Sequence, residues 1–123
     1  MTVCVYLVIA LLVVTKLCDV ASTAQRIGHS GAETNPIARR MMIRVGTGRA
    51  IWIVFILALI IIGIAGGAAV AGGNLMKSLF IVVGLAISII QGAVAHCNWS
   101  GHENAITRRV RVLHAGLLQF MQR

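Results

Sequence analysis

Three long apolar segments, separated by short stretches that hold nearly all of the charges, form the main pattern of this chain. The clearest covers residues 50–71 and contains no ionisable side chain. At about 1.5 Å per residue a helix over this segment is roughly 33 Å long, enough to cross a hydrocarbon core of about 30 Å. A chain of 123 residues has no interior deep enough to bury such a helix on every side. The pattern therefore predicts a transmembrane helix.

The first apolar segment lies near the N-terminus. Residues 3–14 are unbroken and apolar, and the predicted span extends to residue 24 because Lys16 can reach a headgroup with its long side chain. A cleaved signal peptide is the alternative for this segment. The segment has no basic residue ahead of its apolar run, which argues against a signal.

The third apolar segment covers residues 78–96 and follows a short turn. Trp52 and Trp99 fall at the ends of the second and third segments, where an indole ring prefers the level of the lipid headgroups. The sequence therefore predicts an all-α integral membrane protein, a single membrane domain with spans at about 3–24, 50–71 and 78–96.

Two amphipathic helices are predicted outside the spans. In the loop 25–49, Pro36 suits the first turn of a short helix, and its apolar residues are spaced by four at Ile37, Met41 and Val45. The C-terminal segment 101–122 follows a capping-box pattern at residues 100–103 and repeats apolar residues at helical spacing. We expect the first helix to lie in the membrane interface, and the second to lie there or to pack on a partner.

The charge balance is strongly basic, with 11 Lys and Arg residues against 3 acids. Because the basic residues flank apolar spans, they indicate contact with anionic lipid headgroups rather than with nucleic acid. The arginines expected to make this contact are Arg39, Arg40, Arg44, Arg49, Arg108, Arg109 and Arg111.

The distribution of arginines also predicts the orientation. The first connection holds five arginines and the tail holds four, whereas the N-terminus has none and the turn before the third span has only Lys77. Basic loops stay on the cytoplasmic side, and three spans place the first connection and the tail on the same side. We therefore expect the N-terminus outside and the C-terminus in the cytoplasm, in a bacterial inner membrane or a virion membrane derived from it.

Small residues recur every four positions in the second and third spans. Such stripes let helix backbones approach closely where lipid removes the hydrophobic drive for association. The two stripes predict close packing between the second and third spans, or contact with another subunit or a second copy, through Gly63, Gly67, Gly84, Ser88 and Gly92.

Few polar residues are candidates for chemistry. Thr15, Asp19 and Thr23 share one face of the first predicted helix, and an ionisable residue inside a span is a functional candidate. A local ion pair with Lys16, or a hydrogen bond to the following loop, explains Asp19 without a function. Both interpretations stay open at this stage.

No motif supports catalysis or metal binding. The histidines and cysteines match no ligand spacing, and no G-x-S-x-G, H-E-x-x-H or G-K-[ST] motif occurs. The three cysteines are too scattered for a disulfide framework. The sequence therefore predicts a protein that is not an enzyme and has no cofactor and no metal.

The segments 17–23 and 31–36 carry an Asp-x-x-x-Thr pattern followed by Gly-x-Glu-x-Asn-Pro. In this first third of the chain the sequence resembles a family of small bacterial multi-span membrane proteins of unknown function. The resemblance implies that the signature positions are Asp19, Thr23, Glu33, Asn35 and Pro36. One hypothesis for their role is that Asp19 or Thr23 accepts hydrogen bonds from loop amides between residues 31 and 35, which would lock the loop.

Three functions are compatible with these features. The first is a structural or accessory subunit of a larger membrane assembly, such as a respiratory or transport complex or a membrane-containing virion. The second is a phage holin, since the length and topology resemble the three-span holin class. The third is a small carrier or channel that uses Asp19.

Overall fold

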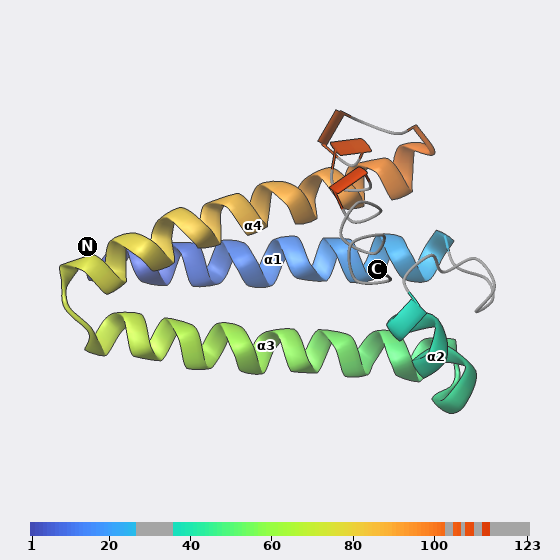
Figure 1. Ribbon diagram of the computed structural model, residues 1–123, viewed down its shortest axis with the longest axis horizontal. Helices are drawn as coiled ribbons and strands as arrows, with labels where there is room; N and C mark the ends of the chain where they lie inside the picture. Colours follow the sequence, from blue (N-terminus) through green and yellow to red (C-terminus); the bar gives the residue numbers. More distant parts are fainter. Residues whose placement is uncertain (27–35, 103–104, 107, 110–111, 114–123) are drawn as a thin grey trace, which may run out of the picture.

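The computed structural model describes residues 1–26, 36–102, 105–106, 108–109 and 112–113 (Figure 1). Four helices carry this part of the chain, and no strand occurs in it. They are α1 (Thr2–Arg26), α2 (Pro36–Val45), α3 (Thr47–Ala71) and α4 (Asn74–Ser100). The helices α1, α3 and α4 are long and apolar enough to cross a membrane. The prediction of an all-α protein with three such helices is therefore confirmed.

Each long helix includes its predicted span and continues past it at one or both ends. The predicted C-terminal helix at 101–122 falls mostly outside the described residues, although the described pairs from 105 to 113 are helical.

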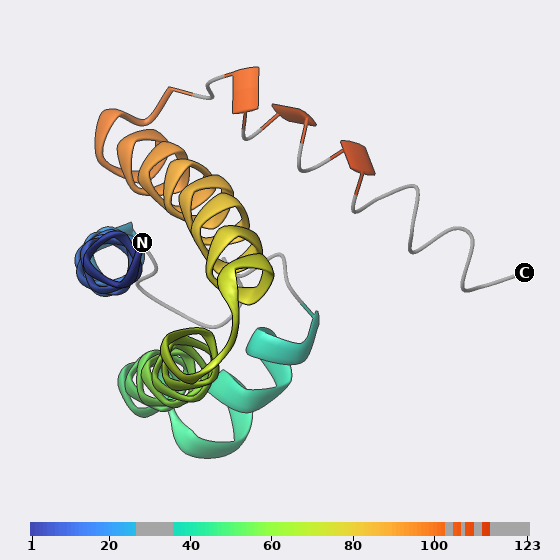
Figure 2. The same ribbon diagram turned by 90° about the vertical axis from the view of Figure 1, so that its left-hand side faces the viewer.

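The helix α1 packs against both α3 and α4 (Figure 1). Seen along the helices, α1, α3 and α4 stand at the corners of a triangle (Figure 2). The antiparallel pair α3 and α4 is joined by the short turn at residues 72–73, yet these two helices contact each other less than either contacts α1. The first helix therefore holds the bundle together.

The helices α1 and α4 run parallel and meet in a regular register. Gly84 lies against Val8, Gln91 bonds to Thr15, and Asn98 bonds to Ser22. Both helices therefore contribute a residue every seven positions, which is the spacing of a coiled-coil contact. We call this line of contact the α1–α4 seam.

Small residues on α4 let α1 come close. A Cβ atom at Gly84 would overlap Val8 Cγ1 and lie 3.3 Å from Leu12 Cδ1. Around this point Val8 and Leu12 of α1 form an apolar cluster with Ile62 of α3, against which Phe80 of α4 also packs. The side chains of α1 thus fill the space that glycine leaves open on α4.

The short helix α2 packs on the bundle at the opposite end from the α3–α4 turn (Figure 1). Met42 is 5% exposed and lies in a cluster with Val20 of α1 and with Ala50 and Ile51 of α3. Met41, one of the predicted apolar residues, packs against this cluster, whereas Val45 is exposed. The position of α2 in the membrane interface stays a prediction.

Gly46 alone separates α2 from α3. Its φ of 89° lies in the left-handed region, which a residue without a Cβ adopts readily. The amide of Gly46 donates to the carbonyl of Met42 at 2.9 Å, and its own carbonyl accepts from Ala50 at 3.0 Å. One glycine therefore ends α2 and starts α3 in a new direction.

Replacing Gly84 by alanine should loosen the bundle, because the added methyl group collides with Val8. We expect a loss of about 1–3 kcal/mol in the free energy of unfolding, as for overpacked cores. The measurement is unfolding of the micelle-bound protein by SDS, followed by helical circular dichroism.

The matched control is Gly92→Ala, two turns further along the same helix, where a Cβ meets nothing within 4 Å. This variant should be neutral or slightly more stable than the original chain. Equal losses in both variants would show that close approach at Gly84 does not govern stability.

Candidate functional site

The polar side chains of the described chain gather where the second half of α1 meets the second half of α4. We call this group the polar seam. It contains Thr15, Lys16, Asp19, Ser22, Thr23, Gln25 and Arg26 from α1, and Gln91, Asn98 and Trp99 from α4.

The first contact of the polar seam joins Thr15 and Gln91. The Thr15 hydroxyl lies 2.8 Å from Gln91 Oε1 and 2.9 Å from the carbonyl oxygen of Leu11. A hydroxyl carries a single hydrogen, so it donates to one of these oxygens at a time. The bond to Gln91 ties the two helices together near their middle.

Asn98 makes the densest set of hydrogen bonds in the polar seam. Its Oδ1 accepts from Arg26 Nη1 at 2.9 Å, and its Nδ2 donates to Ser22 Oγ and to Thr23 Oγ1, each at 3.3 Å. Ser22 is fully buried, and its hydroxyl donates to the backbone carbonyl of Asp19 at 2.9 Å. A single asparagine therefore satisfies three polar side chains of α1.

Trp99 adds a contact at the end of the polar seam. Its indole Nε1 donates to Gln25 Oε1 at 3.0 Å, while the ring stays exposed. The helix α4 ends at the next residues, where Gly101 has a φ of 69° and its backbone N–H donates a hydrogen bond to the Cys97 carbonyl. This is a left-handed C-terminal cap.

Asp19 forms an ion pair with Lys16, with 2.7 Å between Oδ2 and Nζ. The two side chains are 15% and 17% exposed and lie one turn apart on α1. A buried charge is tolerated when it is paired and hydrogen-bonded. Of the two interpretations that the sequence left open, the local ion pair is the one this geometry favours.

The remaining signature residues divide between described and undescribed parts of the chain. Thr23 accepts a hydrogen bond from Asn98, and Pro36 is the first residue of α2. Glu33, Asn35 and the loop amides of the locking hypothesis lie outside the described residues.

The small residues predicted for helix packing play different parts. Gly84 and Ser88 are buried, and the contacts of Gly84 are with α1 rather than with α3. A Cβ at Gly63, Gly67 or Gly92 would meet nothing within 4 Å. Gly84 therefore packs against α1, whereas a contact of Gly63, Gly67 and Gly92 with another subunit or a second copy stays a prediction.

The arginines predicted to meet lipid headgroups are exposed wherever their side chains are described, at Arg40, Arg44, Arg49, Arg108 and Arg109. Arg39 and Arg111 have side chains outside the described set. Exposure leaves the described guanidinium groups available to solvent or to phosphate.

Sequence reasoning missed the two α4 residues on which the polar seam depends, Gln91 and Asn98. The signal was present as a matched spacing. Thr15 and Ser22 are seven residues apart on one helix, and Gln91 and Asn98 are seven apart on the other. Two equal polar spacings on parallel helices predict a polar contact between them.

The chain matches no protein-family model, no curated protein and no solved structure. In the described part of the chain, no three residues of the types His, Cys, Asp and Glu lie together as a metal ion would require. The polar seam joins hydroxyls, amides and one ion pair to each other. Its chemistry is that of a helix contact.

Replacing Asn98 by alanine should separate the ends of α1 and α4, because Arg26, Ser22 and Thr23 each lose a partner. We expect a loss of about 1–2 kcal/mol in unfolding free energy, the sum of modest hydrogen bonds in an apolar surrounding. SDS titration measures it. Asn74→Ala, at an exposed position, should have no effect, and a similar loss there would refute the assignment.

The ion pair predicts a specific pattern of stabilities. Asp19→Asn and Lys16→Met should each destabilise the chain more than the double variant does, because each single change leaves one charge unpaired. A coupling of about 1 kcal/mol or more in this double-mutant cycle is expected. Additive effects would show that the two side chains do not interact.

Proposed function

We propose that this chain is an integral membrane protein that serves as a non-enzymatic structural or accessory subunit of a larger membrane assembly. The observation that carries the proposal is the distribution of polar and apolar side chains on the long helices. The side chains of the polar seam on α1 and α4 bond to one another, and large apolar side chains are exposed on all three long helices. Such a surface suits lipid and other membrane helices.

The exposed face of α3 supports a partner in the membrane. Of the three long helices, α3 is the most apolar and the least buried, with 11% of its most apolar window covered. Gly63 and Gly67 lie on it one turn apart with open space beside them. A pair of glycines four residues apart allows close approach of a second helix, from another subunit or a second copy.

The arginine-rich end supports the proposed orientation. Arg40, Arg44 and Arg49 are exposed on α2 and at the start of α3, and Trp52 is exposed close by in the sequence. Arginine and tryptophan together are typical of the cytoplasmic interface. We propose that this end faces the cytoplasm and contacts anionic headgroups.

The observed ion pair lowers the support for a carrier that uses Asp19, because the carboxylate is already neutralised by Lys16. A holin is the alternative that expression distinguishes. Induction of a holin stops growth abruptly, whereas an accessory subunit is silent or mildly toxic.

The test of the proposed assembly is the variant Gly63→Leu with Gly67→Leu. Both side chains enter open space, so the fold should stay intact. We expect the native complex to shrink or to lose its co-extracted subunits in blue native electrophoresis after mild detergent extraction. The control Ile56→Leu with Ile60→Leu changes exposed residues of the same helix and should leave the complex unchanged.

Extraction of the original chain as a monomer without other subunits would refute the proposal. A complex of unchanged size in the leucine variant would refute the role of the glycine face.

A further inference from the structure

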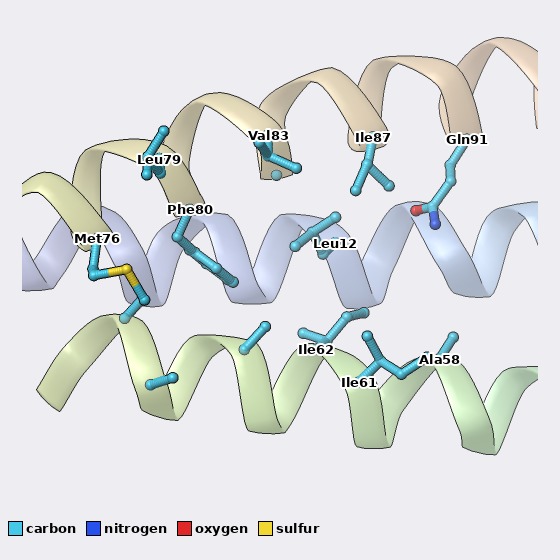
Figure 3. A pocket seen from close by; sticks show the side chains of 14 residues that line it. Leu12, Ala58, Ile61, Ile62, Met76, Leu79, Phe80, Val83, Ile87 and Gln91 are labelled. Atoms are coloured by element: carbon cyan, nitrogen blue, oxygen red, sulfur yellow. The ribbon is translucent and has the colours of Figure 1, made fainter. Parts of the chain in front are cut away.

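A groove of about 590 Å³ lies between α3 and α4, with Leu12 of α1 behind it (Figure 3). All of its lining side chains are apolar except that of Gln91. Apolar cavities stay dry, and walls that face a void lose dispersion contacts. A hydrocarbon occupant therefore suits this groove better than water.

The groove covers only part of the helix length. Its lining extends from Ala58 to Ala69 on α3 and from Met76 to Gln91 on α4, and no residue between 47 and 57 contributes. At about 1.5 Å per residue these stretches are roughly 16 Å and 22 Å long, both shorter than a hydrocarbon core of about 30 Å. A partner helix crosses both halves of a membrane, whereas an acyl chain occupies one leaflet. The length of the groove thus favours an acyl chain.

The two ends of the groove differ in polarity. Gln91, whose amide bonds to Thr15, lines the end farther from the α3–α4 turn (Figure 3). Met76 lines the end near the turn, and the next residue is Lys77, the only ionisable side chain between residues 50 and 95. Lys77 has no acidic partner among the described residues. Its ammonium is available for a phosphate group.

The volume of the groove agrees with one acyl chain of ordinary length. An apolar cavity of about 150 Å³ accepts benzene. The groove is about four times larger and has room for on the order of two dozen carbon atoms by the same ratio.

We propose that the groove between α3 and α4 binds one acyl chain of an anionic phospholipid from the leaflet on the side of the α3–α4 turn, with the phosphate on the Lys77 ammonium. This inference rests on the membrane insertion proposed above.

The experiment is native mass spectrometry of the full chain released from nanodiscs of phosphatidylglycerol and phosphatidylcholine. Ala65 is exposed and lines the groove, so Ala65→Phe fills it. We expect the original chain to retain one phospholipid and this variant to retain it roughly tenfold less. Lys77→Gln should lower the preference for phosphatidylglycerol over phosphatidylcholine.

Ala86→Phe is the matched control, since Ala86 is an exposed alanine of α4 that does not line the groove. Retention should be unchanged in this variant. Equal retention in the original chain and in both phenylalanine variants would overturn the proposal.

A photo-crosslinking p-benzoylphenylalanine in place of Phe80, an aromatic residue that already lines the groove, identifies the occupant directly. An adduct with the mass of a phospholipid supports the proposal, and an adduct with another protein or a second copy overturns it. Resistance of the chain to carbonate extraction tests membrane insertion separately. A chain that carbonate releases would refute both proposals, whereas an inserted chain without the lipid adduct would refute this one alone.

Discussion

The close approach of α1 to α4 is the contact on which the other features of this molecule depend. Gly84 leaves room for Val8 and Leu12, and this room brings the two parallel helices into a seven-residue register. The same register carries Gln91 to Thr15 and Asn98 to Ser22. With α1 on that face of α4, the helix α3 is held mainly through α1, and the groove opens between α3 and α4. The packing of the bundle, the hydrogen bonds between α1 and α4, and the groove thus all follow from the space that Gly84 leaves for α1.

The α1–α4 seam changes character along its length. Near the α3–α4 turn the contact is apolar, around Val8 and Leu12. Toward the arginine-rich end it becomes polar, with hydroxyls and amides that find partners on the other helix. In an apolar surrounding each such bond adds little more than in water, yet an unpaired polar group there is costly. The polar part therefore selects one register among those that apolar packing alone would allow.

The number and type of the long helices could be predicted from the sequence because each span is predominantly apolar, a property that needs no knowledge of neighbours. The pairing of the helices could not. The turn at 72–73 suggested that glycines of α3 and α4 face one another, but a third helix competes for the same small residues, and Gly84 receives α1. The packing of Met42 of α2 against Val20 and Ile51 could not be predicted for a similar reason, since periodicity holds no information on distant neighbours. The Lys16–Asp19 pair was foreseeable because its partners lie one turn apart.

Some polar residues of α1 have partners nearby in the sequence and others have distant partners, so their contacts form at different times during synthesis. Lys16 and Asp19 neutralise each other within α1, so this ion pair can form as soon as the helix is synthesised. Ser22 and Thr23 accept their hydrogen bonds from Asn98 only when this residue has emerged from the ribosome, more than seventy residues later. During that interval the end of α1 that carries Ser22 and Thr23 lacks the hydrogen bonds from Asn98. The hydrogen bonds between the ends of α1 and α4 therefore form late, after the last of the long helices has been synthesised.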